Sequence, residues 1–99
     1  MENVKVVKIG DNEYKFELDR AGIIRAEEVY GVSLVKIEEQ LISQSYKLWS
    51  AGLHKHHNNI SIEKRYDLFD ELNRQDGSSM EVIGFLVETI GNFLNPTQK

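Results

Sequence analysis

The chain contains no cysteine, and this single absence excludes several classes of protein. Without a thiol there can be no disulfide framework, no thiolate nucleophile and no cysteine-based zinc site. The same absence fits a protein that works in a reducing cytoplasm. Proline occurs once, at Pro96, so no proline interrupts a helix before the last residues of the chain.

Long apolar runs and a basic charge excess are also missing. No run approaches the roughly 18 apolar residues that cross a bilayer, so we expect no membrane segment. The first residues carry no apolar signal core, so we expect no secretory signal. The formal net charge of −4 is spread over both halves of the chain, and neither half forms a basic field. Nucleic acid is therefore not expected as the main partner.

The 99 residues are predicted to form a single domain, residues 1–99. Alternating apolar side chains predict strands at Val4–Ile9 and Tyr14–Leu18, joined by a turn that contains Gly10. Favourable cap and stop residues predict four further segments as helices. The predicted N-terminal caps are Asp19, Ser33, Ser61 and a capping box of Ser78 with Glu81. These helices are expected at Arg20–Tyr30, Leu34–Lys55, Ile62–Gln75 and Ser79–Leu94. The predicted fold class is α+β, mainly helical, with an N-terminal β-hairpin followed by about four helices.

The second predicted helix carries two apolar stripes, whereas an ordinary surface helix needs one. Leu34, Leu41 and Leu48 belong to the first stripe. The second stripe lies about 100° away around the helix. Two stripes are typical of a central helix or of a helix that also meets a partner, and both interpretations stay open. The second stripe consists of Val35, Ile42, Tyr46, Trp49 and Leu53.

The third and fourth predicted helices each have an apolar face. In the third, the inward face is predicted at Ile62, Tyr66, Phe69 and Leu72. In the fourth, a wide apolar arc indicates either burial on several sides or an interaction surface. Phe85 lies outside this arc, among polar residues, and an aromatic residue exposed there would have no role in folding. The arc consists of Met80, Val82, Ile83, Leu86, Val87, Ile90, Phe93 and Leu94.

Candidate catalytic and metal-binding residues do not form a recognisable site. His54, His56 and His57 are close in sequence, but on a continuing helix they point in divergent directions, so a polar helix end is the favoured interpretation. Neighbouring carboxylates such as Glu27 and Glu28 also diverge on a helix and fit a solvated face. No phosphate loop, nucleophile elbow or dinucleotide fingerprint occurs. We therefore expect no enzyme activity, no metal and no cofactor.

The order of motifs along the whole chain resembles that of the small tail assembly chaperones of tailed bacteriophages. The resemblance starts with a hairpin and a helix that is closed by Gly31. A helix that ends in Trp49-Ser50-Ala51-Gly52-Leu53 follows, and then a polar loop, His56-His57-Asn58-Asn59. Ser61-Ile62-Glu63 then opens a helix, and an apolar helix completes the order. The chain departs from the family pattern at Ser50, which is inserted between Trp49 and Ala51, and in its doubled histidines.

The resemblance implies a non-catalytic protein of the host cell cytoplasm. Such a protein binds the tape measure protein and helps to deliver tail tube subunits during tail assembly. The unpaired hairpin edge and the wide apolar arc add the expectation of a homo-oligomer. The competing class is a small adaptor or regulatory interaction module, antitoxin-like, of a phage or prophage. Neighbouring genes for a tail tube protein and a very long tape measure protein would favour the chaperone.

The predicted partner-binding residues are apolar side chains that the core does not require. The first stripe of the second helix is sufficient for packing, which leaves the second stripe free for a partner. Aromatic residues such as Trp49, Tyr46 and Phe85 commonly anchor interfaces. The predicted site therefore consists of Val35, Ile42, Tyr46, Trp49, Leu53 and Phe85.

Overall fold

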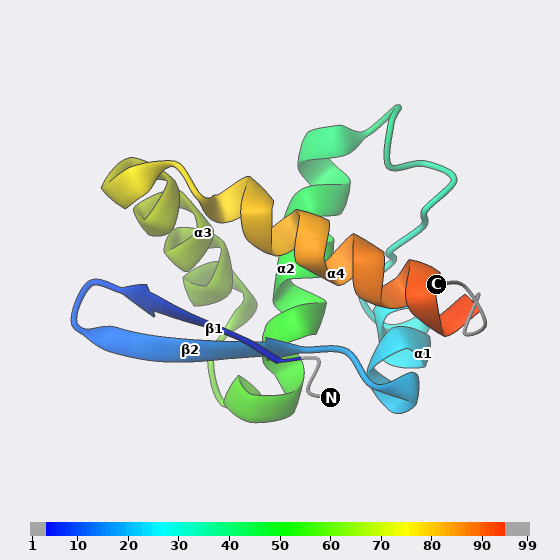
Figure 1. Cartoon of the computed structure of the whole chain (residues 1–99), viewed down its shortest axis with the longest axis horizontal. Helices are drawn as coiled ribbons and strands as arrows, with labels where there is room; N and C mark the ends of the chain where they lie inside the picture. Colours follow the sequence, from blue (N-terminus) through cyan, green and yellow to red (C-terminus); the bar gives the residue numbers. More distant parts are fainter. Residues whose placement is uncertain (1–3, 95–99) are drawn as a thin grey trace.

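A computed structural model describes residues 4–94 of the chain. It contains a β-hairpin followed by four helices (Figure 1), which confirms the predicted α+β, mainly helical class. The helices lie on one side of the hairpin, with α4 crossing in front of α2. The elements are β1 (Val4–Ile9), β2 (Asn12–Glu17), α1 (Arg20–Glu28), α2 (Leu41–His57), α3 (Ile62–Asp76) and α4 (Ser79–Leu94).

The hairpin is antiparallel and has a two-residue loop, Gly10–Asp11. Gly10 has a φ of 63°, which fits a turn with glycine at its first central position. Because the loop takes only two residues, β2 begins at Asn12, two residues before the predicted start. Ile9 and Phe16 are buried on the side of the sheet that faces the helices. The hairpin therefore covers one side of the core and is not an independent unit.

Helix α1 begins and ends near the predicted residues. The Asp19 carboxylate accepts a hydrogen bond from the backbone N–H of Gly22 at 2.8 Å, which confirms the predicted cap. The helix ends at Glu28, two residues earlier than expected. Gly31 follows with a φ of 77°, a conformation that suits glycine and turns the chain away from the helix axis.

Helix α2 begins at Leu41, and the prediction that it begins at Leu34 is wrong. Residues 34–40 form a run of turns in place of a regular helix. The cause lies in the buried side chain of Gln44. Its Oε1 accepts a hydrogen bond from the Ser33 N–H at 2.7 Å, and its Nε2 donates to the Gly31 carbonyl at 3.3 Å. These bonds hold the start of the α1–α2 connection against α2, so the intervening residues must loop outward.

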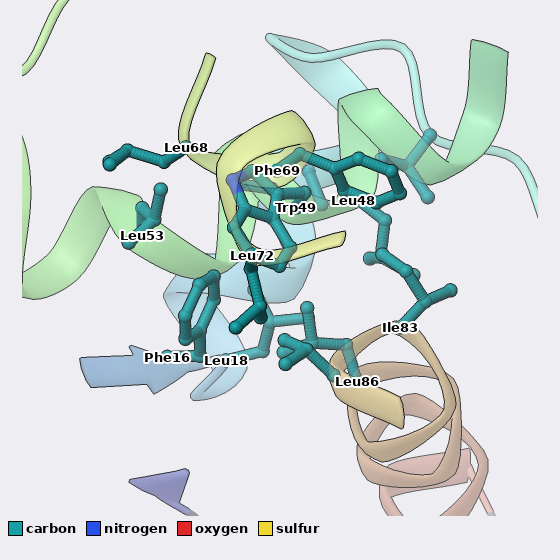
Figure 2. Close-up of a cluster of buried hydrophobic side chains, with 14 of the residues drawn as sticks. Phe16, Leu18, Leu48, Trp49, Leu53, Leu68, Phe69, Leu72, Ile83 and Leu86 are labelled. Carbon is teal, nitrogen blue, oxygen red and sulfur yellow. The ribbon is translucent and has the colours of Figure 1, made fainter. Parts of the chain in front are cut away.

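The prediction that the second helix is central is confirmed. Helix α2 contacts β2, α1, α3 and α4, and residues 48–53 are all buried. Gly52 marks the closest approach, because a Cβ atom there would lie 2.9 Å from Cδ1 of Leu86 on α4. Figure 2 shows the side chains that meet around this helix. They include Phe16, Leu18, Leu48, Trp49, Leu53, Leu68, Phe69, Leu72, Ile83 and Leu86.

Helices α3 and α4 begin and end within one residue of the predicted bounds. Fewer of their apolar residues are buried than their apolar faces contain. Ser61 caps α3 by accepting a hydrogen bond from the Lys64 N–H at 3.1 Å. Ser78 does not form the expected cap with Glu81, because its hydroxyl donates to the Asp76 carboxylate at 2.6 Å. Four apolar residues of these faces are exposed, since each lies at a helix end beyond the reach of the core: one was predicted to face inward, and three belong to the arc whose role was left open. The four are Ile62, Met80, Phe93 and Leu94.

Candidate partner-binding surface

Two of the predicted partner-binding residues, Trp49 and Leu53, belong to the core, so their assignment to the partner site is wrong. Both side chains are completely buried. The Trp49 ring packs against Phe16 and Phe69, with ring centroids 4.6 and 5.0 Å away. The physical reason is that α2 is enclosed along its second half, so both of its apolar stripes are needed for packing there.

Phe85 is also misassigned as an exposed anchor. Its side chain is half-buried and packs against the core. At 100° per residue, Phe85 lies only about 60° around the helix from Val82, which is buried. The aromatic ring is large enough to reach the core from this border position. The residue therefore contributes to the packing of α4 and exposes only part of its surface.

The remaining predicted residues stay at the surface but do not form one stripe. Val35 is 89% exposed and Ile42 is 74% exposed. Val35 lies in the turns that precede α2, so it does not share a helical face with Ile42. Tyr46 lies one turn after Ile42 and is half-buried. The exposed part of the predicted site is thus confined to the first turn of α2 and the loop before it.

An apolar groove occupies this end of the molecule, between the beginning of α2, the middle of α3 and the beginning of α4. It has a volume of about 290 Å³. Leu41, Ile42 and Met80 form its exposed rim, with 50%, 74% and 44% of their surfaces accessible. Its base is formed by side chains of the packed interior. The complete lining is Leu41, Ile42, Ser45, Tyr46, Phe69, Asn73 and Met80.

Tyr46 lies between the groove and a second, more polar hollow, because its side chain lines both. A hydrogen bond and two aromatic contacts hold this side chain in place. Its hydroxyl donates a hydrogen bond to the Asp70 carboxylate, which raises the pKa of Tyr46, and burial raises this pKa further. The ring packs against Tyr66 and Phe69 at centroid distances of 5.0 and 4.5 Å. The second hollow has a volume of about 360 Å³ and is lined by Ser43, Tyr46, Lys47, Tyr66 and Asp70.

The predicted site lacks five of the seven lining residues of this groove, and three of the five are apolar. Leu41 and Phe69 were expected to face the core, and Met80 belongs to the arc whose role was left open. Leu41 and Met80 each belong to the first two residues of a helix, where a side chain can extend past the element on which the helix packs. An apolar residue at the start of a helix is therefore the sequence signal that could have indicated this groove. The helical period alone does not distinguish such a residue from a core residue.

The three histidines form hydrogen bonds with three different residues, two on β2 and one just after α1. His56 Nε2 lies 2.8 Å from the Glu17 carboxylate, and His57 Nε2 accepts a hydrogen bond from the Lys15 backbone N–H at 2.9 Å. His54 Nδ1 lies 2.8 Å from the Tyr30 hydroxyl. They therefore fasten the end of α2 to β2 and to the end of α1. Among residues 4–94, no group of three or more His, Asp or Glu side chains is arranged to hold a metal ion.

A buried arginine, Arg65, forms hydrogen bonds with several polar groups near the second half of α2. Only 3% of its surface is accessible. Its guanidinium donates to the carbonyls of Ile60 and Ser50 at 2.8 and 2.9 Å and to the Tyr30 hydroxyl at 2.7 Å. Since these acceptors are neutral, the group works as a hydrogen-bonding hub that joins α2 and α3 to the segments around Tyr30 and Ile60.

The Arg65 hub is linked to His54 through the Tyr30 hydroxyl. Because the Tyr30 hydroxyl accepts from Arg65, its own proton is available for His54 Nδ1. Burial lowers the pKa of His54, and the positive charges of Arg25 and Arg65 lower it further. These effects favour the neutral form of His54, and the cluster has the character of a structural network.

No protein-family model, curated protein or solved structure matches this chain. Within residues 4–94, none of the helices has the length and apolar character needed to cross a membrane.

Proposed function

We propose that this protein is a non-catalytic tail assembly chaperone of a tailed bacteriophage. In this role it binds the tape measure protein in the host cell cytoplasm and helps to deliver tail tube subunits during assembly. The order of motifs along the chain supports the proposal. The observation that carries it is the apolar groove lined by Leu41, Ile42 and Met80, at one end of an otherwise closed core.

The groove has the properties of a helix-binding site. Its rim residues come from two helices, and its base is anchored by Phe69 and by the Tyr46–Asp70 hydrogen bond. A rigid base limits the conformational entropy lost on binding. An amphipathic helix would place apolar side chains at spacings of three and four residues between Ile42 and Met80. Such helices are the segments of a long tape measure chain that must be shielded before the tube covers them.

The expected strength of one contact is modest, which suits a chaperone that must release its client. Burial of one large aliphatic side chain at an interface contributes about 1.5–3 kcal/mol. A groove with three such rim residues therefore binds reversibly. Many copies along one tape measure chain would raise the overall affinity through multivalency. The net charge of −4 favours solubility of the complex.

Self-association is part of the proposal and would use a different surface. Phe93 and Leu94, at the end of α4, are 47% and 63% exposed. They lie at the opposite end of α4 from Met80, so a contact between copies there would leave the groove open. A second copy that covered these residues would reduce the exposed apolar surface of the free protein.

Co-expression with the tape measure protein tests the proposal. The chaperone role predicts that the tape measure protein, encoded near a tail tube gene, becomes soluble and co-purifies with this chain. An adaptor or antitoxin-like module would leave the tape measure protein insoluble and would instead capture a small partner. Failure to co-purify with any part of the tape measure protein would reject the chaperone role.

A further inference from the structure

The outer edge of strand β1 is open, whereas the outer edge of β2 is closed. Cross-strand pairing places Val6 opposite Lys15 and Ile9 opposite Asn12 across the two-residue loop. In such a hairpin the pair next to the loop is hydrogen-bonded, and alternate pairs direct their amides outward. The outward residues are therefore Val4, Val6 and Lys8 on β1, and Glu13, Lys15 and Glu17 on β2.

Two hydrogen bonds confirm these directions. The Lys15 N–H is directed away from β1 and donates to His57, which closes the β2 edge. The Lys8 carbonyl is directed away from β2 and accepts from Gln75 Nε2 at 3.1 Å. Among residues 4–94, no group accepts a hydrogen bond from the outward amides of Val4 and Val6. Gln75 therefore covers this edge only beside Lys8 and Gly10. Val6 is 52% exposed, which agrees with an open edge at Val4 and Val6.

A groove of about 330 Å³ runs beside this open edge, between β1 and the corner where α3 meets α4. Leu72 and Val82 contribute to its lining and are almost completely buried, so they form its base. Asp76 and Glu81 are exposed and form the far rim. Neither carboxylate forms an ion pair with another residue of the described chain. The groove also contains two cationic residues, Lys5 and Lys8, but both belong to β1, so the acidic charge is confined to the α3–α4 side.

We propose that this groove binds an extended peptide segment, which adds a strand to β1 and alternates apolar with basic residues. The backbone of the segment would pair with Val4 and Val6. The apolar side chains would point toward Leu72 and Val82. The lysine or arginine side chains between them would start on the opposite face and extend along the exposed rim toward Asp76 or Glu81. This site lies on the other side of the α3–α4 corner from the Met80 groove, so it is independent of the proposed function.

The shape of the groove favours a single strand over a second copy of the domain. Ser78 and Glu81 close the groove on the side away from β1. A second copy paired through its own β1 would place its β2 about 4.8 Å further out, against this wall. A lone extended segment meets no such obstacle.

The test uses a short acetylated and amidated peptide that alternates valine with lysine. Titration of ¹⁵N-labelled full-length protein should shift the amide signals of Val4 and Val6 and slow their hydrogen exchange. The Val6→Pro variant removes one outward N–H without breaking a bond of the hairpin and should bind about tenfold more weakly. The matched control Val6→Thr keeps the N–H and should bind like the unmodified protein.

Two altered peptides keep the test independent of how well the proline variant folds. A peptide N-methylated at alternate residues should not bind, because it cannot complete the ladder. A peptide with glutamate in place of lysine should bind about two- to fivefold more weakly.

Three results would overturn the proposal. The first is an absence of shifts at Val4 and Val6. The second is shifts confined to the residues around Ile42 and Met80. The third is protection of the Val4 and Val6 amides that rises with protein concentration before any peptide is added, since this would show that a second copy occupies the edge.

Discussion

The indole Nε1 of Trp49 donates a hydrogen bond to the backbone carbonyl of Arg65 at 2.8 Å, inside the core. This contact joins α2 to α3 at the point where the Arg65 guanidinium turns back to the Ser50 carbonyl. Trp49 on α2 therefore donates to Arg65 on α3, and Arg65 donates back to Ser50, the residue after Trp49. Trp49 is a structural residue for this reason, even though its residue type is common at interfaces.

Replacing Trp49 by phenylalanine should destabilise the domain without affecting the proposed groove. The Trp49→Phe variant loses the bond to the Arg65 carbonyl and leaves part of the ring volume empty. We expect the free energy of unfolding to fall by about 1–3 kcal/mol, measured by urea denaturation. Capture of the tape measure protein by the folded fraction should be unchanged. A stable Trp49→Phe variant that has lost capture would return this residue to the binding site.

Two glycine substitutions should have opposite effects because their surroundings differ. In Gly52→Ala the new Cβ would lie 2.9 Å from Leu86 and 3.3 Å from Phe16, so we expect a loss of about 1–3 kcal/mol. In the control Gly84→Ala the new Cβ meets nothing within 4 Å. That variant should gain up to about 1 kcal/mol from helix propensity. Thermal melts of both would test the packing, and equal melting temperatures would contradict it.

Stability should decrease as the pH falls below about 6.5. Burial lowers the pKa of His57 below its ordinary value of 6.5, and the charges of His56, Lys15 and Arg65 lower it further. The pKa of His54 is lowered as well. The unfolded chain therefore binds protons that the folded protein does not. The stabilisation is complete above pH 6.5 and is lost as the pH falls toward the lowered folded-state pKa.

Urea denaturation at a series of pH values measures this effect, and glutamine variants supply the control. In His57→Gln the side-chain oxygen can still accept from the Lys15 N–H but does not titrate. The His54→Gln/His57→Gln variant should lose less stability than the wild-type protein between pH 7 and pH 5. Glu17 and Asp19 also have lowered pKa values, but their loss of stability occurs at lower pH, near and below 4.5. Identical pH dependence in both proteins would refute the assignment.

The exposed end of α4 should govern self-association. Leu94→Ser removes an apolar side chain that is 63% exposed, so it should not destabilise the fold. If copies meet through this end, sedimentation at tens of micromolar should show oligomers of the wild-type protein and a smaller average mass for Leu94→Ser. A wild-type protein that stays monomeric would contradict the expected homo-oligomer and leave the groove unaffected.

Most of the fold could be predicted from the sequence because local signals and packing agree. Asp19, Ser61 and Gly77 mark helix ends by hydrogen bonds and backbone conformation that these residue types favour. The start of α2 could not be predicted, since it depends on the buried Gln44 amide and its bonds to Ser33 and Gly31. A helical period continued through Leu34–Gln40 contains no information about that tertiary contact.

The predicted site was less reliable than the predicted fold for a related reason. An apolar stripe shows that a face needs covering, but the sequence does not identify what covers it. Trp49 and Ile42 share a stripe seven residues apart. One is covered by β2 and α3, and the other extends past every neighbouring element. Only the arrangement of the helices distinguishes them.

The most direct test of the account measures binding of the purified tape measure protein, or its apolar helical segments, to two matched variants by calorimetry. Ile42→Ser changes a groove residue that is 74% exposed, and Val29→Ser changes an equally apolar residue, 70% exposed, that lines none of the described grooves. Both should melt like the wild-type protein. We predict that Ile42→Ser raises the Kd about tenfold or more while Val29→Ser leaves it unchanged. Wild-type affinity in Ile42→Ser, or equal losses in both variants, would contradict the groove as the chaperone site.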